Sequence, residues 1–424
     1  MTRTHRVSQL PSMREFRKLA TVAVVAACSG TEAPRQPIGA ITPIDAPAGP
    51  LSGEPSLAVD ANGRVYLSWL ERKSDSTVAL HLAVRDGATW SAPSTVTARS
   101  DLFVNWADFP TVFVAPSGRV VMHWLQKRPG GKYSYDVVTR QSTDGGTTWS
   151  EPRVLHDDNV AAEHGFVSFF AADGDSVEAV WLDGRATAGG GHDSHNAPRG
   201  AMQLGNARIG PDGGIAPSTM IDDRICDCCQ TSAAMTSRGP VVVYRDRSPD
   251  EIRDIAILRR VDGKWTQPAR VHADEWHIEG CPVNGPSVVA NGEHVAVAWF
   301  TGARDTARVN VAFSADAGAT FSAPVRVDDG NPAGRVDVEF DGTGRALVTW
   351  LERVGDQGAE VRLRSIAPDG SASPAVVVAS SAAARSSGFP RMVRSGTNVV
   401  FAWTQPGDTA RVRLAVASLG TSGR

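Results

Sequence analysis

EPSLAVDANGRVYLSWLE, residues 54–71, contains a short strand pattern, a glycine turn and a returning strand that ends in tryptophan and a polar residue. Two strands joined by such a turn form a β-hairpin, because glycine permits the backbone conformation that the turn needs. The same arrangement recurs in FPTVFVAPSGRVVMHWLQ (109–126) and RVDVEFDGTGRALVTWLE (335–352). The chain is therefore predicted to be a repeat protein built from β-hairpins.

Four further copies of this unit, at 166–183, 229–246, 285–301 and 389–405, bring the total to seven. Each copy has one landmark aromatic residue, and these are Trp69, Trp124, Trp181, Tyr244, Trp299, Trp350 and Trp403. Consecutive landmarks lie 51 to 63 residues apart, which is enough for one four-stranded sheet. This periodicity predicts an all-β, seven-bladed β-propeller within a single domain from about residue 40 to 420.

The seventh unit lacks a fourth strand, because the chain ends soon after RVRLAVASLG (411–420). The segment AITPID (40–45) has the strand pattern that is missing there. We expect this N-terminal strand to pair with the last blade and to close the ring, which would leave no exposed sheet edge.

The composition fits this fold and excludes one class of partner. The 424 residues include 41 Gly and 26 Pro, which suit many short strands and tight turns. Lys and Arg number 43 against 46 Asp and Glu, a net charge of −3, with no basic stripe along the chain. Binding to nucleic acid is therefore not expected, since it requires a concentrated positive field.

The N-terminus has the pattern of an export signal. Arg14, Arg17 and Lys18 precede the apolar run 19–27, which ends at Cys28. That run is too short to span a bilayer, and small residues before a cleavage point are typical of signal peptides.

Residues 25–29, VAACS, resemble a bacterial lipobox, which implies that Cys28 becomes the lipidated first residue of the mature chain. We expect 1–28 to be the signal, with translation starting at Met1 or Met13, and 29–39 to be a tether. This predicts a lipid-anchored protein of the bacterial cell envelope, in the periplasm or at the outer membrane. A plain secretory signal is the alternative.

Two turns carry a further motif. STDGGTTW (142–149) and SADAGATF (314–321) both fit the pattern S-x-D-x-G-x-T-[W/F]. This is the Asp box, and with the repeats it makes the chain resemble the sialidase superfamily of Asp-box, or BNR-repeat, β-propellers. The resemblance implies structural roles for four residues: Asp144 and Asp316 in the turns, and Trp149 and Phe321 packed between blades.

The resemblance also implies a glycan-related function of the exo-α-sialidase type, but the chain departs from the family in two respects. Sialidases have six blades, which makes a six-bladed ring the alternative to the seven units counted here. Their F/Y-R-I-P segment is absent, and the nearest fragment is Phe389-Pro390-Arg391. None of the four tyrosines lies in a segment that matches the sialidase nucleophile. Catalytic residues are therefore not transferred from the family.

Candidate catalytic carboxyl groups lie in the loops that lead into the first strand of each unit. In a propeller these loops share one face with the loops between strands two and three, opposite the Asp boxes. Asp108, beside an aromatic residue, is the candidate general acid, and Glu163 is the weaker alternative. An acid near apolar surface has a raised pKa. The alternative role of Asp108 is to cap a turn.

Arginine is concentrated in YRDRSPDEIRD (244–254). Guanidinium groups suit carboxylate or phosphate ligands, so this segment predicts a clamp for an anionic ligand. An internally paired salt-bridge loop is the alternative. The candidate ligand-binding residues are Arg245, Asp246, Arg247, Arg253, Asn284 and Arg391.

Four cysteines lie in the loops that lead into repeats four and five: Cys226, Cys228 and Cys229 in one loop and Cys281 in the other, with Cys226 and Cys281 at equivalent places. Their loops are expected to be neighbours, so one or two disulfides between blades are predicted for an exported chain. A copper or zinc site is the alternative, with His164, His277, or His192 and His195 as further ligands.

Three functions remain open at this stage. The leading hypothesis is an exported sialidase-like propeller that binds, and in one version hydrolyses, a glycan or other anionic ligand on its axial face. The others are a non-catalytic binding or assembly platform, and a periplasmic Cys/His metal or redox protein. No cofactor is expected unless the cysteines hold a metal. We expect a monomer whose only membrane contact is the lipid anchor.

Overall fold

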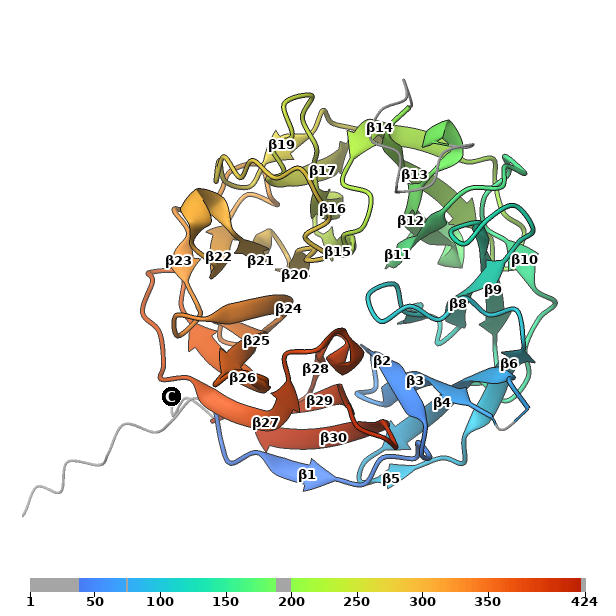
Figure 1. The fold of residues 1–424 in the computed structure, drawn as a ribbon, viewed down its shortest axis with the longest axis horizontal. Helices are drawn as coiled ribbons and strands as arrows, with labels where there is room; N and C mark the ends of the chain where they lie inside the picture. The colour runs from blue at the N-terminus through green and yellow to red at the C-terminus, as the bar shows by residue number, and fades with distance from the viewer. Residues whose placement is uncertain (1–37, 74, 188–199, 421–424) are drawn as a thin grey trace, which may run out of the picture. The chain divides into compact units, whose positions relative to one another are not determined.

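The computed structural model describes residues 38–73, 75–187 and 200–420. In this part of the chain, seven antiparallel sheets are arranged around a central axis (Figure 1). The prediction of an all-β, seven-bladed propeller is confirmed, and the six-bladed alternative is wrong. Among the described residues, no helix has the length and apolar character needed to cross a membrane.

Each blade is a meander whose first strand lies nearest the axis. The first strands are β2 (Ser52–Val59), β7 (Val112–Val114), β11 (His164–Ala171), β15 (Ser232–Thr236), β20 (Ser287–Asn291), β24 (Pro332–Phe340) and β28 (Arg391–Ser395). The second strands are β3 (Val65–Arg72), β8 (Val120–Lys127), β12 (Val177–Asp183), β16 (Gly239–Arg245), β21 (His294–Thr301), β25 (Ala346–Val354) and β29 (Asn398–Gln405).

The third strands are β4 (Val78–Asp86), β9 (Tyr135–Ser142), β13 (Met202–Ile209), β17 (Ile255–Val261), β22 (Arg308–Ser314), β26 (Gly358–Ile366) and β30 (Arg411–Ser418). The outer strands are β1 (Thr42–Ile44), β5 (Thr89–Trp90), β6 (Ser94–Arg99), β10 (Arg153–Val154), β14 (Thr219–Ile225), β18 (Lys264–Trp265), β19 (Ala269–Arg270), β23 (Val325–Arg326) and β27 (Val376–Ala382). Four short 3-10 helices lie in loops: η1 (Asp173–Asp175), η2 (Arg185–Thr187), η3 (Ala303–Asp305) and η4 (Arg385–Ser387).

The two ends of the described chain meet in blade 7. β1 pairs with β30, with Thr42 opposite Val416, and forms the outer strand of the sheet that also contains β29 and β28 (Figure 1). Ile38 forms a further bridge with Leu419. The last blade is therefore assembled from both ends of the described chain.

The recurring tryptophan followed by a polar residue has a physical reason. The landmark aromatics are buried, and a buried indole N–H needs an acceptor. In blade 3 the Trp181 indole donates to Asp183, 2.8 Å away, and in blade 6 the Trp350 indole donates to Glu352 at 2.6 Å. In five blades the polar residue two positions after tryptophan supplies that acceptor, whereas in blade 5 the Trp299 indole donates to Asp274.

The Asp boxes close the turns between third and fourth strands. Asp144 accepts hydrogen bonds from the backbone N–H of Thr147 and Thr148, and Asp316 accepts one from Thr320. Hydrogen bonds from the Thr148 and Thr320 hydroxyl groups, and next these backbone bonds, lower the pKa of the two carboxyl groups to about 2. Two faces result: the Asp boxes lie on one, and the lead-in loops before each first strand define the opposite one, here called the lead-in face.

Candidate functional site on the lead-in face

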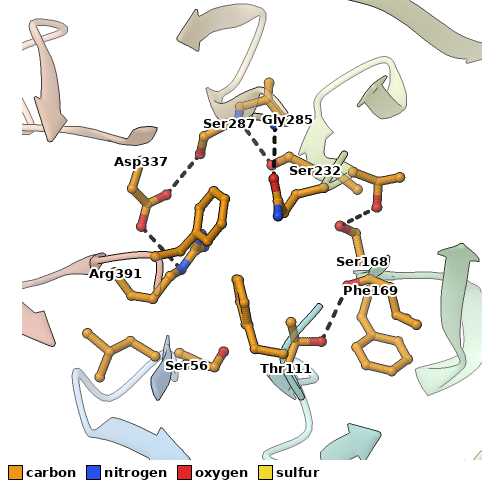
Figure 2. Close-up of a pocket in the computed structure, with 18 of the residues that line it drawn as sticks. Ser56, Thr111, Ser168, Phe169, Ser232, Gly285, Ser287, Asp337 and Arg391 are labelled. Atoms are coloured by element: carbon orange, nitrogen blue, oxygen red, sulfur yellow. Dashed lines mark hydrogen bonds and ion pairs between the residues drawn. The ribbon is translucent and has the colours of Figure 1, made fainter. Parts of the chain in front are cut away.

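An axial cavity of about 330 Å³ is lined by the first strands of all seven blades. One residue per blade forms a polar ring around it, and Figure 2 shows these side chains: Ser56, Thr111, Ser168, Ser232, Ser287, Asp337 and Arg391. Most of this ring joins neighbouring blades. For example, Ser232 accepts the backbone N–H of Val288 at 3.1 Å, and Asp337 accepts that of Met392 at 2.9 Å.

Arg391 is the one arginine among the cavity-lining residues, and its partners limit its availability. Its Nε lies 3.4 Å from Asp337 Oδ2, and Figure 2 shows Asp337 between Ser287 and Arg391. Glu339 lines the same cavity, where burial and the charge of Asp337 raise its pKa to about 8. The structure thus places Arg391, a predicted ligand-binding residue, in the cavity and beside a carboxylate.

Asp108 lies at the junction of blades 2 and 3, where it is 2% exposed. Its Oδ1 accepts the backbone N–H of Phe166 at 2.7 Å, and Oδ2 has no hydrogen-bond partner among the described residues. Burial, followed by the nearby charge of Glu163, raises the pKa of Asp108 well above its ordinary value. A carboxyl group in this state keeps its proton to a higher pH than an ordinary aspartic acid, but it is enclosed.

Asn284 occupies the equivalent place at the junction of blades 5 and 6. Its Oδ1 accepts the backbone N–H of Arg335 at 2.7 Å, and its Nδ2 donates to the carbonyl groups of Pro282 and Ala333. Like Asp108, it bonds to the first strand of the next blade. Asn284, predicted to bind a ligand, therefore has a bonding role between blades in the structure.

Glu163 and Asp108 are close together, with Tyr135 beside them. The Tyr135 hydroxyl donates to Glu163 Oε1 at 2.7 Å, and its ring stacks on Phe103 with centroids 4.2 Å apart. Tyr135 is 0% exposed. The structure thus brings both candidate catalytic carboxyl groups together around a buried tyrosine that sequence reasoning did not select.

A second cavity, of about 490 Å³, opens on the lead-in face among blades 7, 1 and 2, and we call it the rim pocket. Its lining includes three partly exposed aromatic rings, from Phe103, Trp106 and Tyr133. Arg72 and Lys132 line it as exposed cations. Sequence reasoning did not place these residues in one pocket.

Glu54 adds an acid to the rim pocket. It has a positive φ of 53°, and its backbone N–H donates to the Thr404 hydroxyl at 3.1 Å. One carboxyl oxygen has no hydrogen-bond partner among the described residues, and burial raises the pKa of the group. The Glu54-Pro55 pair is visible at the start of the first repeat, but it fits the repeat pattern, so sequence reasoning did not select Glu54 as a site residue.

Two side chains pack against the ring of Trp106. Its ring stacks on Phe389 with centroids 5.8 Å apart, and the Arg335 guanidinium lies 4.7 Å from its ring centroid. Arg335 is 6% exposed, and within the described residues it forms no ion pair. Burial and the charges of Arg353 and Arg385 lower its pKa to about 10. The lead-in face therefore has buried positive charge beneath an aromatic ring.

The arginine-rich segment of blade 4 is mostly paired within itself. Arg245 is 1% exposed and donates to the carbonyl groups of Asn284, Arg253 and Phe300. Arg247 and Arg253 both pair with Glu251, at 2.6 and 2.7 Å.

Asp246 accepts the backbone N–H of Arg247 at 2.7 Å. Burial, and next the charge of Asp222, raises the pKa of Asp246 to about 6. The predicted anion clamp and Arg391 do not form one site. The geometry of residues 245–253 matches the alternative of an internally paired loop.

The four cysteines of repeats four and five meet at one junction, and no disulfide joins them in the structure. His164 is not with them: its Nε2 lies 2.9 Å from Asp158, and its ring stacks on His156 with centroids 3.7 Å apart. His192, His195 and Cys28 lie outside the described residues.

Comparison with known proteins adds a family to this geometry. Residues 64–204, which span most of blades 1 to 3, match the BNR repeat-like domain. Residues 64–204 thus carry BNR-like repeats within the seven-bladed β-propeller. The resemblance drawn from the Asp boxes is thereby confirmed.

Three solved structures resemble this BNR-repeat propeller. The BP39L lectin from Burkholderia pseudomallei has a TM-score of 0.61 at 10% identity, over 89% of this chain and 98% of that one. A protein of unknown function from Dyadobacter fermentans has a TM-score of 0.51 at 13% identity, over 91% and 99%. The polysaccharide lyase Uly1 has a TM-score of 0.51 at 10% identity, over 87% and 90%. No curated protein matched by sequence. At these identities the likeness is one of fold.

Proposed function

We propose that this BNR-repeat propeller binds an acidic glycan, a sugar bearing a carboxylate, in the rim pocket of its lead-in face. The observation that carries the proposal is the combination of three aromatic rings with two exposed cations, Arg72 and Lys132, around one cavity. Ligand pockets typically combine apolar walls with a few placed polar groups. Aromatic rings can pack on the faces of a sugar, while guanidinium groups bond its carboxylate.

The rim pocket is also prearranged for binding. Trp106 is supported by Phe389 and Arg335, so ordering this ring at binding costs little entropy. Among the solved structures of similar fold, one is named a lectin and one a polysaccharide lyase. These names support a carbohydrate as the ligand class.

We propose binding rather than hydrolysis for this site. Asp108 and Tyr135 are 2% and 0% exposed, so neither reaches a sugar in the rim pocket without movement of the loops above them. A general acid must come within hydrogen-bond reach of the atom that it protonates. The same argument weakens a sialidase-type role for the Asp108–Glu163 pair.

Calorimetric titration of the whole chain with sialyllactose, a glucuronate oligosaccharide and neutral lactose tests this proposal. We expect an acidic sugar to bind and lactose to bind at least about tenfold more weakly, since a lost charge-assisted bond is worth about 1.5–3 kcal/mol. Trp106→Ala and Arg72→Ala should each weaken binding, whereas Arg326→Ala, at an exposed arginine of blade 5, should not. Equal affinity in all three variants would overturn the site.

An assay with a fluorogenic sialoside distinguishes glycan hydrolysis from glycan binding. We expect no turnover from the wild-type chain. Turnover that disappears in Asp108→Asn would assign hydrolysis to this protein and contradict the binding-only proposal.

We also propose that the chain is exported and lipid-anchored through Cys28. This rests on the basic residues, short apolar run and lipobox-like VAACS of residues 14–29. Labelling of growing cells with a palmitate analogue should mark the wild-type chain and Cys281→Ser but not Cys28→Ser. Label on Cys28→Ser would contradict the anchor.

A further inference from the structure

Four cysteines from two lead-in loops gather at the junction of blades 4 and 5. Cys226, Cys228 and Cys229 lie in the loop between β14 and β15, and Cys281 lies in the loop before β20. The Sγ of Cys226 is 3.3 Å from that of Cys229 and 3.9 Å from that of Cys228. The Cys281 thiol interacts with that of Cys228. Two loops more than 50 residues apart in sequence thus bring cysteines to the same junction.

The three thiols of the first loop form a compact, enclosed set. Cys226, Cys228 and Cys229 are 1%, 8% and 1% exposed, and their sulfur atoms all lie within 4.8 Å of one another. A tetrahedral metal with metal–sulfur bonds of about 2.3 Å separates its sulfur ligands by about 3.8 Å. The observed separations lie on either side of that value, so one ion fits among these atoms with small adjustments.

The surroundings supply the outer contacts that a thiolate site needs. Arg253 Nη1 donates to Cys226 Sγ at 3.3 Å, and the backbone N–H of Cys226 donates to the Arg245 carbonyl at 3.0 Å. Arg247 pairs with Asp227, inside the cysteine segment, at 3.2 Å. Hydrogen bonds to the sulfur and nearby positive charge stabilise metal-bound thiolates, which carry a net negative charge.

We propose that Cys226, Cys228, Cys229 and Cys281 form a binding site for one thiophilic d¹⁰ cation, Cu(I) or Zn(II). Thiolates select these ions over the hard cations that carboxylates prefer. The three buried sulfur atoms provide a trigonal set suited to Cu(I), and Cys281 adds the fourth ligand of a tetrahedral zinc site. Cys281 is exposed, which gives the ion a route from solvent. The proposal is independent of glycan binding at the rim pocket.

Metal titration of the reduced whole chain under anaerobic conditions tests the site. Cu(I) is titrated against a chromophoric chelator, and Zn(II) likewise. Co(II) reports sulfur ligation through its thiolate charge-transfer absorption. We expect about one ion per chain in the wild type and in Cys28→Ser, which is the matched cysteine control, and none in Cys226→Ser.

Two further variants distinguish Cu(I) binding from Zn(II) binding and keep the test valid if Cys226→Ser fails to fold. Cys281→Ser changes an exposed side chain and should keep Cu(I) while losing Zn(II). Arg253→Gln keeps all four sulfur ligands and should weaken affinity about 10- to 100-fold, the usual effect of removing an outer contact. Unchanged affinity for both ions in Cys226→Ser and Cys281→Ser would overturn the proposal.

The redox state of the cysteines in the native protein distinguishes a metal site from disulfide bonds. Mass spectrometry of the chain isolated from its compartment under thiol-blocking conditions counts free thiols and disulfides. Two disulfides, combined with no metal uptake after reduction, would replace the metal site by a covalent link between blades. Four thiols, or thiols protected by a bound metal, would support it.

Discussion

Blades 2 and 5 bond to the blades that follow them in the same way, but with different side chains. Asp108 Oδ1 accepts the Phe166 N–H and Asn284 Oδ1 accepts the Arg335 N–H, both at 2.7 Å. The amide of Asn284 also uses its nitrogen, which donates to two backbone carbonyl groups, whereas Asp108 Oδ2 is left without a hydrogen bond among the described residues. The junction therefore needs an acceptor but not an acid.

This difference shows how to interpret the acid in blade 2. An amide satisfies the buried position fully, so a carboxyl group there is not explained by packing alone. Burial raises its pKa, and Glu163 with Tyr135 lies beside it. Perturbed titratable groups concentrate at functional sites, although structural networks produce them too. Variants that exchange the acid of blade 2 and the amide of blade 5 separate a functional role of the acid from a structural one.

The largest effects are expected from the glycines that face these side chains. A Cβ at Gly165 would lie 1.9 Å from Asp108 Oδ2, and one at Gly334 would lie 2.2 Å from Asn284 Oδ1. Overlap of this kind costs about 1–3 kcal/mol or more, so both alanine variants should have a lower free energy of unfolding. Gly334→Ala should lose more, because its φ of +82° also disfavours a side chain. Denaturant unfolding measures this.

Gly280→Ala is the control, since the nearest atom to its added Cβ would be 4.0 Å away. A loss at Gly280 equal to that at Gly165 would mean that the two junctions are not specially tight.

Exchanging acid and amide gives the next largest effect. Asn284→Asp should destabilise the chain by about 1–3 kcal/mol at pH 7, because it removes the nitrogen donors and buries a carboxyl group. A carboxyl group whose pKa is raised on folding contributes its full stability below about pH 4, and that contribution is lost as pH rises through the folded pKa. The loss should therefore shrink at pH 4.

Asp108→Asn should show the opposite trend. Because the pKa of Asp108 is raised on folding, the free energy of unfolding of the wild-type chain falls as pH rises above about pH 4. The amide does not ionise, so the stability of the variant relative to the wild type should increase as pH rises. Melting curves from pH 4 to 8 for both variants measure the effect. Parallel pH profiles for Asp108→Asn and the wild type would contradict the raised pKa.

A smaller effect is expected from the tyrosine that only the blade 2 junction possesses. Tyr135→Phe removes a hydroxyl that donates to Glu163 at 2.7 Å and should cost about 1 kcal/mol in unfolding free energy. Tyr66→Phe is the control, because its hydroxyl lies 3.4 Å from its acceptor Asp60. An equal loss in both variants would show that the Tyr135–Glu163 bond adds nothing specific.

The smallest effects are expected from the Asp boxes, which the same two blades carry. Asp144→Ala and Asp316→Ala should each lower the melting temperature slightly at pH 7. Because the pKa of each carboxyl group is lowered to about 2, its stabilising contribution is present above about pH 4 and lost as pH falls toward 2. The deficit of each variant should therefore fade at pH 2. Asp408→Ala, at an exposed loop residue, is the control.

The fold could be predicted because its signals are local. A glycine turn, alternating apolar residues and one landmark aromatic residue recur within each hairpin, so seven copies were countable in the sequence. Neighbouring lead-in loops follow from the ring itself, and this is why the approach of the loop of residues 226–229 to Cys281 was foreseeable.

The site was harder to predict, because it depends on side chains from several blades. The rim pocket combines Glu54, Trp106 and Lys132 with residues of blade 7, and no short motif links them. Arg245 illustrates the opposite difficulty: its charge favours a ligand, but its burial against backbone carbonyl groups depends on a neighbouring blade. Whether a cation is satisfied within the fold cannot be determined from its own segment.

The pairing of β1 with β30 has a consequence for how the protein reaches its native state. β30 also makes a long-range bond to blade 1: the Val412 N–H donates to the hydroxyl of Ser52, in β2, across a sequence separation of 360 residues. Bringing such distant segments together carries a chain-entropy cost, and folds dominated by long-range contacts form slowly. Blade 7 cannot be completed before β30 has been synthesised, so a chain truncated before β30 would expose unpaired strands to aggregation.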